Sequence, residues 1–302
     1  MSFRRVAIIG LGLIGGSIGL ALRDDGLGTV TTGYDADPAV RVRARARGLV
    51  DHVCDDPGEA VRGADLVILC VPVGAMRDAA AAIAADLSPH CVISDVGSSK
   101  RTITDALTDA LPGFEIIPAH PVAGTEHSGP DAGFATLFNQ RWCIITPPPG
   151  ANPAKVAALV DFWESLGAMV ETMDADHHDR VLAVTSHIPH LIAYTIVGTA
   201  SDMETVTRSE VIKYSAGGFR DFTRIAASDP TMWRDVFLHN RDAVLEMLDT
   251  FLTDLALMRE AIRAGDGQMM FDTFSRTRAI RRSIVALGQD DPRPDFGRSD
   301  HK

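Results

Sequence analysis

A glycine-rich segment near the amino terminus has the spacing of a dinucleotide-binding loop. Residues 10–15 read Gly-Leu-Gly-Leu-Ile-Gly, directly after a short apolar run and before a helical pattern. In that setting Gly10 permits a tight turn, Gly12 lets backbone amides approach a pyrophosphate, and Gly15 lets the helix pack closely on the strand. The helix amino terminus adds amide donors and a partial positive charge. The segment therefore predicts a dinucleotide cofactor.

An acid follows the second predicted strand at the distance that a dinucleotide site requires. Asp35 lies about 20 residues after Gly15, where a carboxylate accepts hydrogen bonds from the adenosine ribose hydroxyls. A carboxylate there repels a 2′-phosphate, which favours NAD over NADP. We interpret the nearby Arg41 and Arg43 as surface charges of the next helix. The alternative for Asp35 is a loop acid, or the cap of the helix that starts at Pro38.

Three clusters of polar residues fall where ligands bind in a parallel α/β sheet, beyond the carboxyl ends of the strands. The first, residues 95–100, ends an apolar strand and opens a helix, and the second, residues 120–126, ends the next strand. The third cluster lies in the second half of the chain and consists of residues 186–190, 217–224 and 229–233. We expect the three clusters to form one site.

The elements that position these clusters alternate between strands and helices through the first half of the chain. Such alternation predicts βαβ units and one mainly parallel sheet. The predicted strands are Arg4–Ile9, Val30–Tyr34, Leu66–Val71, Cys91–Asp95, Glu115–Pro118, Trp142–Thr146 and Ala168–Glu171. The predicted helices are Leu13–Arg23, Pro38–Arg47, Gly74–Leu87, Ser99–Leu111 and Pro153–Leu166.

After about Thr172 the strand pattern stops, and the chain reads as successive helices. Apolar residues recur there at helical spacing, for example at Leu245, Leu248, Leu252 and Leu255. We predict an α/β Rossmann-type NAD-binding domain over residues 1–172 and an all-helical substrate and dimerisation domain over 173–288. The wide apolar helix faces favour a homodimer. The polar tail, 289–302, is expected to be disordered.

The composition indicates a soluble two-domain protein. The chain has 302 residues, of which 46% are hydrophobic and 23% charged, with a formal net charge of −11. This balance argues against nucleic-acid binding, although a local basic site for an anionic substrate remains possible. The cysteines form no CxxC pair and are expected to be reduced thiols: Cys54, Cys70, Cys91 and Cys143. We found no signal peptide and no apolar stretch of the roughly 20 residues that a membrane helix needs, so we predict a cytoplasmic location.

Five segments in this order resemble the prephenate and arogenate (cyclohexadienyl) dehydrogenase family. They are DVGSSK at 95–100, HPVAGTE at 120–126, SHIPH at 186–190, GGFRDFTR at 217–224 and DPTMW at 229–233. The resemblance covers the chain from Gly10 to about Leu287. It implies oxidative decarboxylation with NAD: hydride leaves the ring carbinol carbon, CO2 is lost and the ring becomes aromatic. Prephenate would give 4-hydroxyphenylpyruvate, and arogenate would give tyrosine.

The resemblance also implies roles for single residues. His120 matches the catalytic histidine, and an imidazole can accept the hydroxyl proton as hydride leaves. Ser98 matches a serine that hydrogen-bonds the same hydroxyl, with a helix N-cap as the alternative. Pro72 resembles a turn residue that contacts the cofactor. Lys100 could touch the nicotinamide or the substrate, or could be an exposed first-turn residue.

On the substrate side, Arg224 matches an arginine that binds a carboxylate, which a guanidinium grips with two hydrogen bonds. Asp221 could orient Arg224 by an ion pair. Trp233 could pack on the substrate ring or fill the core. His190 matches a histidine near the substrate side chain. Both His190 and His187 could instead be interior histidines whose rings bond a backbone carbonyl.

Glu126 bears on the choice between the two substrates. Arogenate carries an ammonium where prephenate carries a keto group, so an acid near that end would attract arogenate. Glu126 could equally pair with an arginine and gate the site. We hypothesise that arogenate is accepted, with an arogenate-specific enzyme as the alternative.

Three other functions are weighed against this one. A β-hydroxyacid-type dehydrogenase shares the domain order but typically uses a catalytic lysine in its helical domain, and nothing around Lys213 resembles that motif. A non-catalytic NAD sensor would not need His120, Ser98 and Arg224 together. A metal site is not expected, because the histidines have no ligand spacing that binds metal.

Overall fold

The structure is a computed structural model that describes residues 3–24, 28–125, 127–202 and 217–286. The chain forms two compact units, Met1–Met247 and Leu248–Lys302, which are described separately. Glu126 and the tail 289–302, both named in the sequence analysis, lie outside the described residues. The expected domain boundary at residues 172 and 173 remains a prediction.

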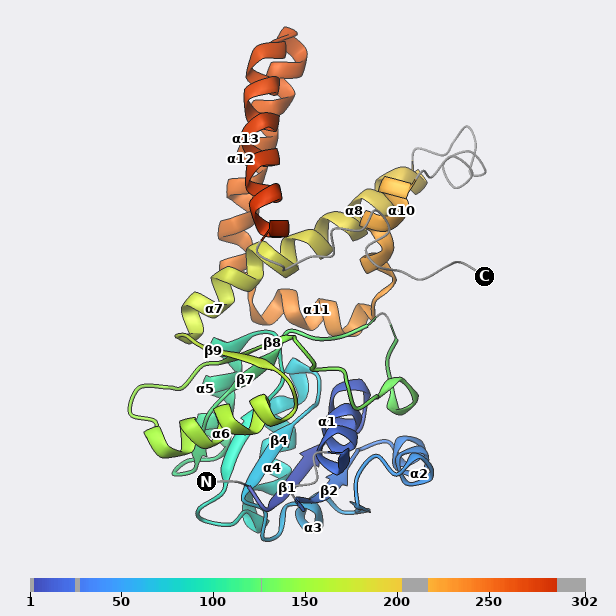
Figure 1. Cartoon of the computed structure of the whole chain (residues 1–302), viewed down its shortest axis with the longest axis vertical. Helices are drawn as coiled ribbons and strands as arrows, with labels where there is room; N and C mark the ends of the chain where they lie inside the picture. The colour runs from blue at the N-terminus through green and yellow to red at the C-terminus, as the bar shows by residue number, and fades with distance from the viewer. Residues whose placement is uncertain (1–2, 25–27, 126, 203–216, 287–302) are drawn as a thin grey trace. The chain divides into compact units, whose positions relative to one another are not determined.

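The first unit is built on a parallel six-stranded sheet with the order β3-β2-β1-β4-β5-β6. In the middle of the sheet, Ile9 at the end of β1 pairs with Tyr34 on one side and Leu69 on the other. The glycine loop and the ends of β2 and β4 therefore meet at one edge (Figure 1). The strands are β1 Arg5–Ile9, β2 Val30–Tyr34, β3 His52–Val53, β4 Leu66–Leu69, β5 Val92–Asp95 and β6 Glu115–Ile116.

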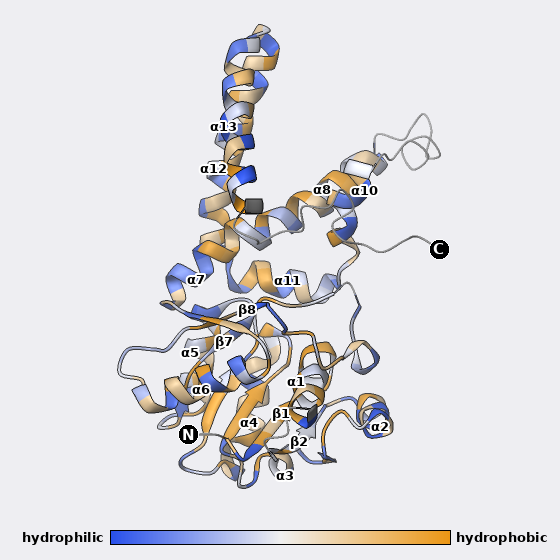
Figure 2. Cartoon of the chain, in the orientation of Figure 1, coloured by the Kyte–Doolittle hydropathy of each residue, from blue (hydrophilic) through white to orange (hydrophobic). Residues whose placement is uncertain are grey.

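Helices cover both faces of this sheet, which explains why its central strands are apolar throughout. Alternate residues of β1 belong to opposite cores, with Ile8 in one buried cluster and Ile9 in the other. Figure 2 shows β1 and β4 as hydrophobic along their length. The helices are α1 Leu13–Asp24, α2 Pro38–Arg47, α3 Pro57–Val61, α4 Met76–Ile83, α5 Lys100–Ala110 and α6 Pro153–Ser165.

A second, three-stranded sheet corrects the expectation of one mainly parallel sheet. It has the order β7-β8-β9, from β7 Ala119–Pro121, β8 Trp142–Ile145 and β9 Met169–Thr172. β7 runs antiparallel to β8, with His120 opposite Ile144. His120 therefore lies inside β7, and not at the end of the strand that begins at Glu115. The chain leaves the first sheet after Ile116, only two residues before β7 begins.

The helical part of the first unit begins with one continuous helix, Ala175–Asp202. It consists of α7 Ala175–Leu182, a π-helical turn Ala183–His187 and α8 Ile188–Asp202. It is followed by α10 Gly217–Thr223 and α11 Pro230–His239. α7 packs on α5, and α11 packs on the turn Val73–Ala75 after β4 (Figure 1). The helical half is thus seated beside the polar segments that follow β4 and β5.

The helix Ala175–Asp202 is long and apolar enough to cross a membrane by length and composition, since it contains an 18-residue window with a mean hydropathy of 1.4. This helix differs from the expectation that the chain contains no apolar stretch of membrane-helix length. The amino-terminal part of this helix carries the buried polar residues His178, Asp179 and His187. A core helix of a soluble protein passes the same test, so this single helix is weak evidence for a membrane.

The second unit is helical in its described part, with the end of α12 Arg241–Ala264 followed by α13 Gly267–Ala286. Several large apolar side chains on these helices are exposed: Leu252, Leu255, Leu257, Ile262, Phe271, Phe274 and Ile280. Such an exposed apolar surface on a helix pair is typical of a protein–protein interface.

Candidate active site

The glycine loop joins β1 to α1 with the contacts that its spacing predicts. Gly10 has a φ of 101°, and a Cβ there would collide with the carbonyl of Cys70. A Cβ on Gly15 would collide with the carbonyl of Gly10. A Cβ on Gly12 would meet nothing within 4 Å, so this position faces open space. The first and third glycines are thus required by packing, and the second leaves room for a ligand.

Asp35 lies at the end of β2 and is bonded to the glycine loop. Its carboxylate accepts hydrogen bonds from the Leu11 amide at 2.8 Å and the Asp37 amide at 3.0 Å. The helix cap that was the alternative role of Asp35 belongs to Asp37, whose side chain accepts from Ala39. Asp35 is therefore placed at the edge where an adenosine ribose would lie.

Arg41 differs from the expected surface charge, whereas Arg43 agrees with it. The Arg41 side chain is 14% exposed, lies over the Tyr34 ring, and donates from Nη1 to the Asp35 carbonyl at 2.7 Å. The Arg43 side chain is 54% exposed and pairs with Asp131. Arg41 thus braces the loop after β2.

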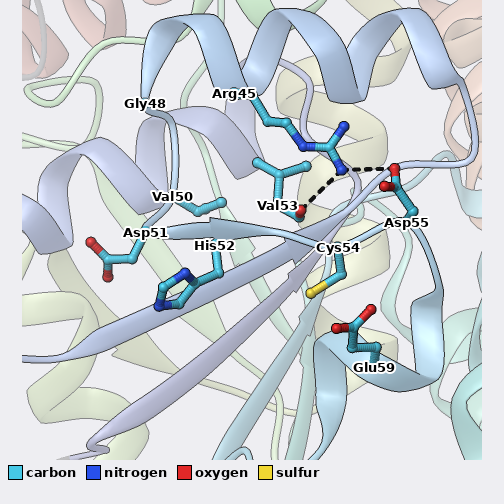
Figure 3. Close-up of a pocket in the computed structure, with 9 residues that line it drawn as sticks. All are labelled: Arg45, Gly48, Val50, Asp51, His52, Val53, Cys54, Asp55 and Glu59. Carbon is cyan, nitrogen blue, oxygen red and sulfur yellow. Dashed lines mark hydrogen bonds and ion pairs between the residues drawn. The ribbon is translucent and has the colours of Figure 1, made fainter.

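Pro72 is exposed and follows β4, the strand next to β1, so it lies near the Gly10 turn. A cavity of about 630 Å³ lies farther out, around β3, and is lined by Arg45, Val53, Cys54, Asp55 and Glu59, among others (Figure 3). Arg45 donates to the Val53 carbonyl and pairs with Asp55 in this cavity. None of its lining residues belongs to the three polar clusters.

His120 is buried in β7, and the residue before it, Ala119, is bonded to a buried ion pair. The Lys100 ammonium lies 2.5 Å from an Asp95 carboxylate oxygen and donates to the Ala119 carbonyl at 2.6 Å. Lys100 is thus neither an exposed first-turn residue nor a free cation, since its side chain is fully buried. Burial, together with the nearby His178, Lys100 and His187, holds the pKa of His120 well below 6.5. The ring is therefore neutral at physiological pH, as a proton acceptor must be.

Helix α5 receives its cap from another part of the chain. The residue at its N-cap position is Ser99, whose buried hydroxyl makes no hydrogen bond among the described residues. The Asp179 carboxylate of α7 instead accepts from the amides of Lys100 at 2.7 Å and Arg101 at 3.0 Å. The capping alternative for Ser98 is therefore wrong. Ser98 lies two residues before the first residue of the helix, in the partly exposed segment after β5.

The two histidines of the third cluster have different surroundings. The His190 ring stacks on Trp233 with a centroid distance of 3.6 Å, and its Nδ1 donates to the Ser186 carbonyl at 2.8 Å. His187 is fully buried, and its Nδ1 accepts a hydrogen bond from the Asn240 side-chain amide at 3.0 Å. Its Nε2 donates to no carbonyl among the described residues. Burial lowers the pKa of His187 to about 4.

Trp233 is buried and also contacts Phe237, so it fills the core while supporting the His190 ring. Burial lowers the pKa of His190, and the charge of Arg224 lowers it further. Asp221 pairs with Arg220 at 3.6 Å. His190, Trp233, Asp221 and Arg224 thus come from α8, α11 and the α10 region of one unit.

Three residues that the sequence analysis did not propose join the clusters. His178 contacts His120, Asp179 caps α5, and Asn240 donates to both the Asp179 carbonyl and His187. Within the described ranges, no group of three or more His, Cys, Asp or Glu side chains could hold a metal ion. The signal in the sequence is a His-Asp pair at the start of the first helix after the last strand.

Known protein families and relatives match most of the chain. Residues 18–172 match the prephenate dehydrogenase nucleotide-binding domain, and residues 174–276 match the prephenate dehydrogenase dimerization domain. The first match begins just after the glycine loop.

A cyclohexadienyl dehydrogenase from Zymomonas mobilis is 46% identical over 282 residues, 93% of this chain and 96% of the relative. A prephenate dehydrogenase from Bacillus subtilis is 32% identical, over 92% of this chain and 76% of the relative.

The crystal structure of prephenate dehydrogenase from Aquifex aeolicus with hydroxyphenyl propionate and NAD+ superposes with a TM-score of 0.87. It is 32% identical, over 94% of this chain and 99% of that chain. The chain belongs to the prephenate dehydrogenase family.

Proposed function

We propose that the chain catalyses the NAD-dependent oxidative decarboxylation of prephenate, arogenate or both. The ring carbinol carbon loses hydride, the ring carboxylate leaves as CO2, and the ring becomes aromatic. The hydroxyl proton is lost while a carbonyl develops at that carbon, and a proton returns to the oxygen once the phenol has formed. The protein must therefore orient the ring, grip its carboxylates and hold one proton.

The residues at the edge of the parallel sheet suit a dinucleotide. The open face of Gly12, the α1 amino terminus and the Asp35 carboxylate supply the pyrophosphate and ribose contacts, and Pro72 lies beside the same loop. NAD+ bound there would accept the hydride. The same cofactor, NAD+, is present in the Aquifex aeolicus complex. The Asp35 carboxylate disfavours the 2′-phosphate of NADP+.

The observation that carries the proposal is the buried neutral ring of His120. Its Nδ1 is engaged by His178, so its Nε2 remains to accept the substrate hydroxyl proton. Ser98 supplies a hydroxyl beside the start of α5 to hydrogen-bond the same substrate oxygen. Arg224 binds a substrate carboxylate, His190 contacts the side chain against Trp233, and Asp221 belongs to the same wall.

The decisive experiment follows NADH formation from each substrate by absorbance. His120→Asn should lower kcat by about 10²–10⁴-fold, the range typical of general-base removal, while the Kd for NAD+ stays within about twofold. His127→Asn, the same change at an exposed loop histidine, is the control and should behave as wild type. Near-normal turnover by His120→Asn would contradict the proposed role.

The finer question of substrate preference rests on Glu126. We propose that its carboxylate attracts the arogenate ammonium, so that arogenate is accepted as a substrate. The kcat/KM ratio of arogenate to prephenate should fall in Glu126→Gln. An unchanged ratio would show that Glu126 does not discriminate between them.

We also propose that the chain is a cytoplasmic homodimer formed through the helical part. Support comes from the dimerization-domain match and from the uncovered apolar side chains of α12 and α13. Light scattering during gel filtration should give twice the 32.4 kDa chain mass. Phe271→Glu, which places a charge on the exposed apolar surface, should shift the population toward monomer.

A further inference from the structure

The Nδ1 atom of the His120 ring is hydrogen-bonded to the imidazole of His178. His120 Nδ1 lies 2.9 Å from Nε2 of His178, and the two rings meet edge to face at 68°. The other nitrogen of His178, Nδ1, lies 2.8 Å from the Asp179 carboxylate. All three side chains are buried. A continuous line of three hydrogen-bonding groups therefore runs inward from the proposed proton acceptor.

Asp179 anchors this line as a carboxylate. Burial opposes its ionisation, but the hydrogen bonds from His178 and from the Lys100 and Arg101 amides outweigh burial and hold the pKa of Asp179 below its usual value. These two amides are at the amino terminus of the 11-residue helix α5, where the helix dipole also favours a negative charge. The Asp179 carboxylate can therefore only accept hydrogen bonds.

The ionised carboxylate determines the tautomers of both histidines. Because Asp179 accepts, His178 must carry its proton on Nδ1, which leaves Nε2 of His178 as an acceptor. His120 must then donate from Nδ1, which leaves Nε2 of His120 unprotonated. The second nitrogen of His120 is thus prepared as a base before any substrate binds.

We infer that Asp179, His178 and His120 form a proton relay in which His178 and Asp179 are positioning residues for the base. The inference rests on the proposed function. As the substrate O–H bond breaks, its proton goes to Nε2 of His120. The Nδ1 proton of His120 moves to Nε2 of His178, which becomes an imidazolium paired with Asp179. The reverse shifts return the proton to the phenol oxygen, so no proton is gained or lost.

The relay places the transient positive charge beside a carboxylate. The groups facing His120 are His178, Lys100 and His187, and those facing His178 are Asp179, Lys100 and Asp95. The Lys100 charge is compensated by Asp95 at 2.5 Å. Asp179 raises the proton affinity of His178 and touches it directly, whereas His120 has no carboxylate partner among the described hydrogen bonds. The proton is therefore held more readily on the inner ring.

Two substitutions separate a relay from simple packing. His178→Gln keeps an oxygen that accepts from His120 Nδ1 but cannot take the proton, so kcat should fall about 10- to 100-fold with KM and the Kd for NAD+ nearly unchanged. Asp179→Asn lets the new amide donate to His178, which reverses both tautomers and leaves His120 Nε2 protonated. Its kcat should fall by about 10²–10⁴-fold. Asp176→Asn, an exposed change on the same helix, is the matched control.

The pH profile adds a readout that a packing defect would not move. In wild type, protonation of His178 switches His120 to the inactive tautomer and sets the acidic limb of kcat/KM. In His178→Gln that limb should move to lower pH, because only the less basic His120 remains to titrate. Unchanged kcat together with an unchanged limb in His178→Gln would overturn the relay. It would leave the proposed function intact if His120→Asn is still inactive.

A measurement on the unmodified protein covers the case in which Asp179→Asn does not fold. Nitrogen-15 NMR of histidine-labelled wild type, with His120 assigned from the missing signals of His120→Asn, reports which ring nitrogen carries hydrogen. We expect an unprotonated Nε2 and a protonated Nδ1 on His120 at neutral pH. The opposite tautomer would refute the relay whatever the activities are.

Discussion

The buried pair of Lys100 and Asp95 should be a large single contribution to the stability of the site. Both side chains are fully buried, and the ammonium reaches the Asp95 carboxylate at 2.5 Å and the Ala119 carbonyl at 2.6 Å. Lys100→Met keeps most of the volume but leaves a buried charge and one carbonyl without their partner. Breaking such a pair costs about 3–5 kcal/mol. The carboxylate retains the Gly97 amide at 2.7 Å, so we expect the free energy of unfolding to fall by about 3–4 kcal/mol.

A double-mutant cycle isolates the charge term. In Asp95→Asn/Lys100→Met neither charge remains, and the asparagine oxygen still accepts from the backbone, so the loss should be only about 1–2 kcal/mol. The loss in Lys100→Met should then exceed the loss in the double variant by at least about 1 kcal/mol, and the coupling free energy between the two positions is this difference plus the loss in Asp95→Asn.

Urea unfolding at fixed protein concentration, followed by tryptophan fluorescence, measures each variant. Burial already raises the pKa of Asp95 against the lowering effect of Lys100. Without the lysine, protonating Asp95 relieves the defect, so the loss in Lys100→Met should shrink as the pH falls from 7 to 5. If the single variant loses less than about 1 kcal/mol, or the double variant is no better than the single one, the pair does not stabilise the site as reasoned.

Three other outcomes follow from the same contacts. Asp35→Ser should raise the kcat/KM ratio of NADP+ to NAD+ by about tenfold or more, measured by steady-state rates, since a carboxylate no longer repels the 2′-phosphate. Gly15→Ala should lower the Tm, because its Cβ would meet the Gly10 carbonyl, whereas Gly12→Ala should keep the Tm and weaken only NADH binding in a fluorescence titration. The pKa of His187 is about 4 in the folded protein and near 6.5 in the unfolded chain. Between these values only the unfolded chain binds the proton. The free energy of unfolding should therefore fall as the pH drops below about 6.5, by up to about 1.4 kcal/mol per pH unit. Urea unfolding at pH 7 and pH 5 should show a smaller difference in His187→Gln.

The parallel sheet could be predicted because its central strands, β1 and β4, are apolar almost throughout and alternate along the chain with helical patterns. Val30–Tyr34 and Pro38–Arg47 have the predicted bounds, the latter because Asp37 and Gly48 cap the helix at both ends. β3 has only two residues and α3 only five, too short for any periodic pattern to appear. The sequence therefore did not predict β3 or α3.

The site was predicted in part, for a different reason. His120 belongs to a motif, but β7 contains a proline and pairs with a strand more than 20 residues later, which no local pattern reveals. The contacts of His178 and Asp179 join residues 58 and 79 positions apart along the chain. Their partners depend on how α7 docks on α5, and that is a property of tertiary packing.

The capping of α5 by Asp179 couples the two halves of the protein during assembly. The amino terminus of α5, next to Ser98, is completed only after the chain has continued past the last strand and brought α7 back against it. A fragment ending near residue 172 would retain the nucleotide fold and still lack its helix cap. Chimeras that exchange helical halves between relatives should therefore function only when the incoming half supplies an acid at the position of Asp179.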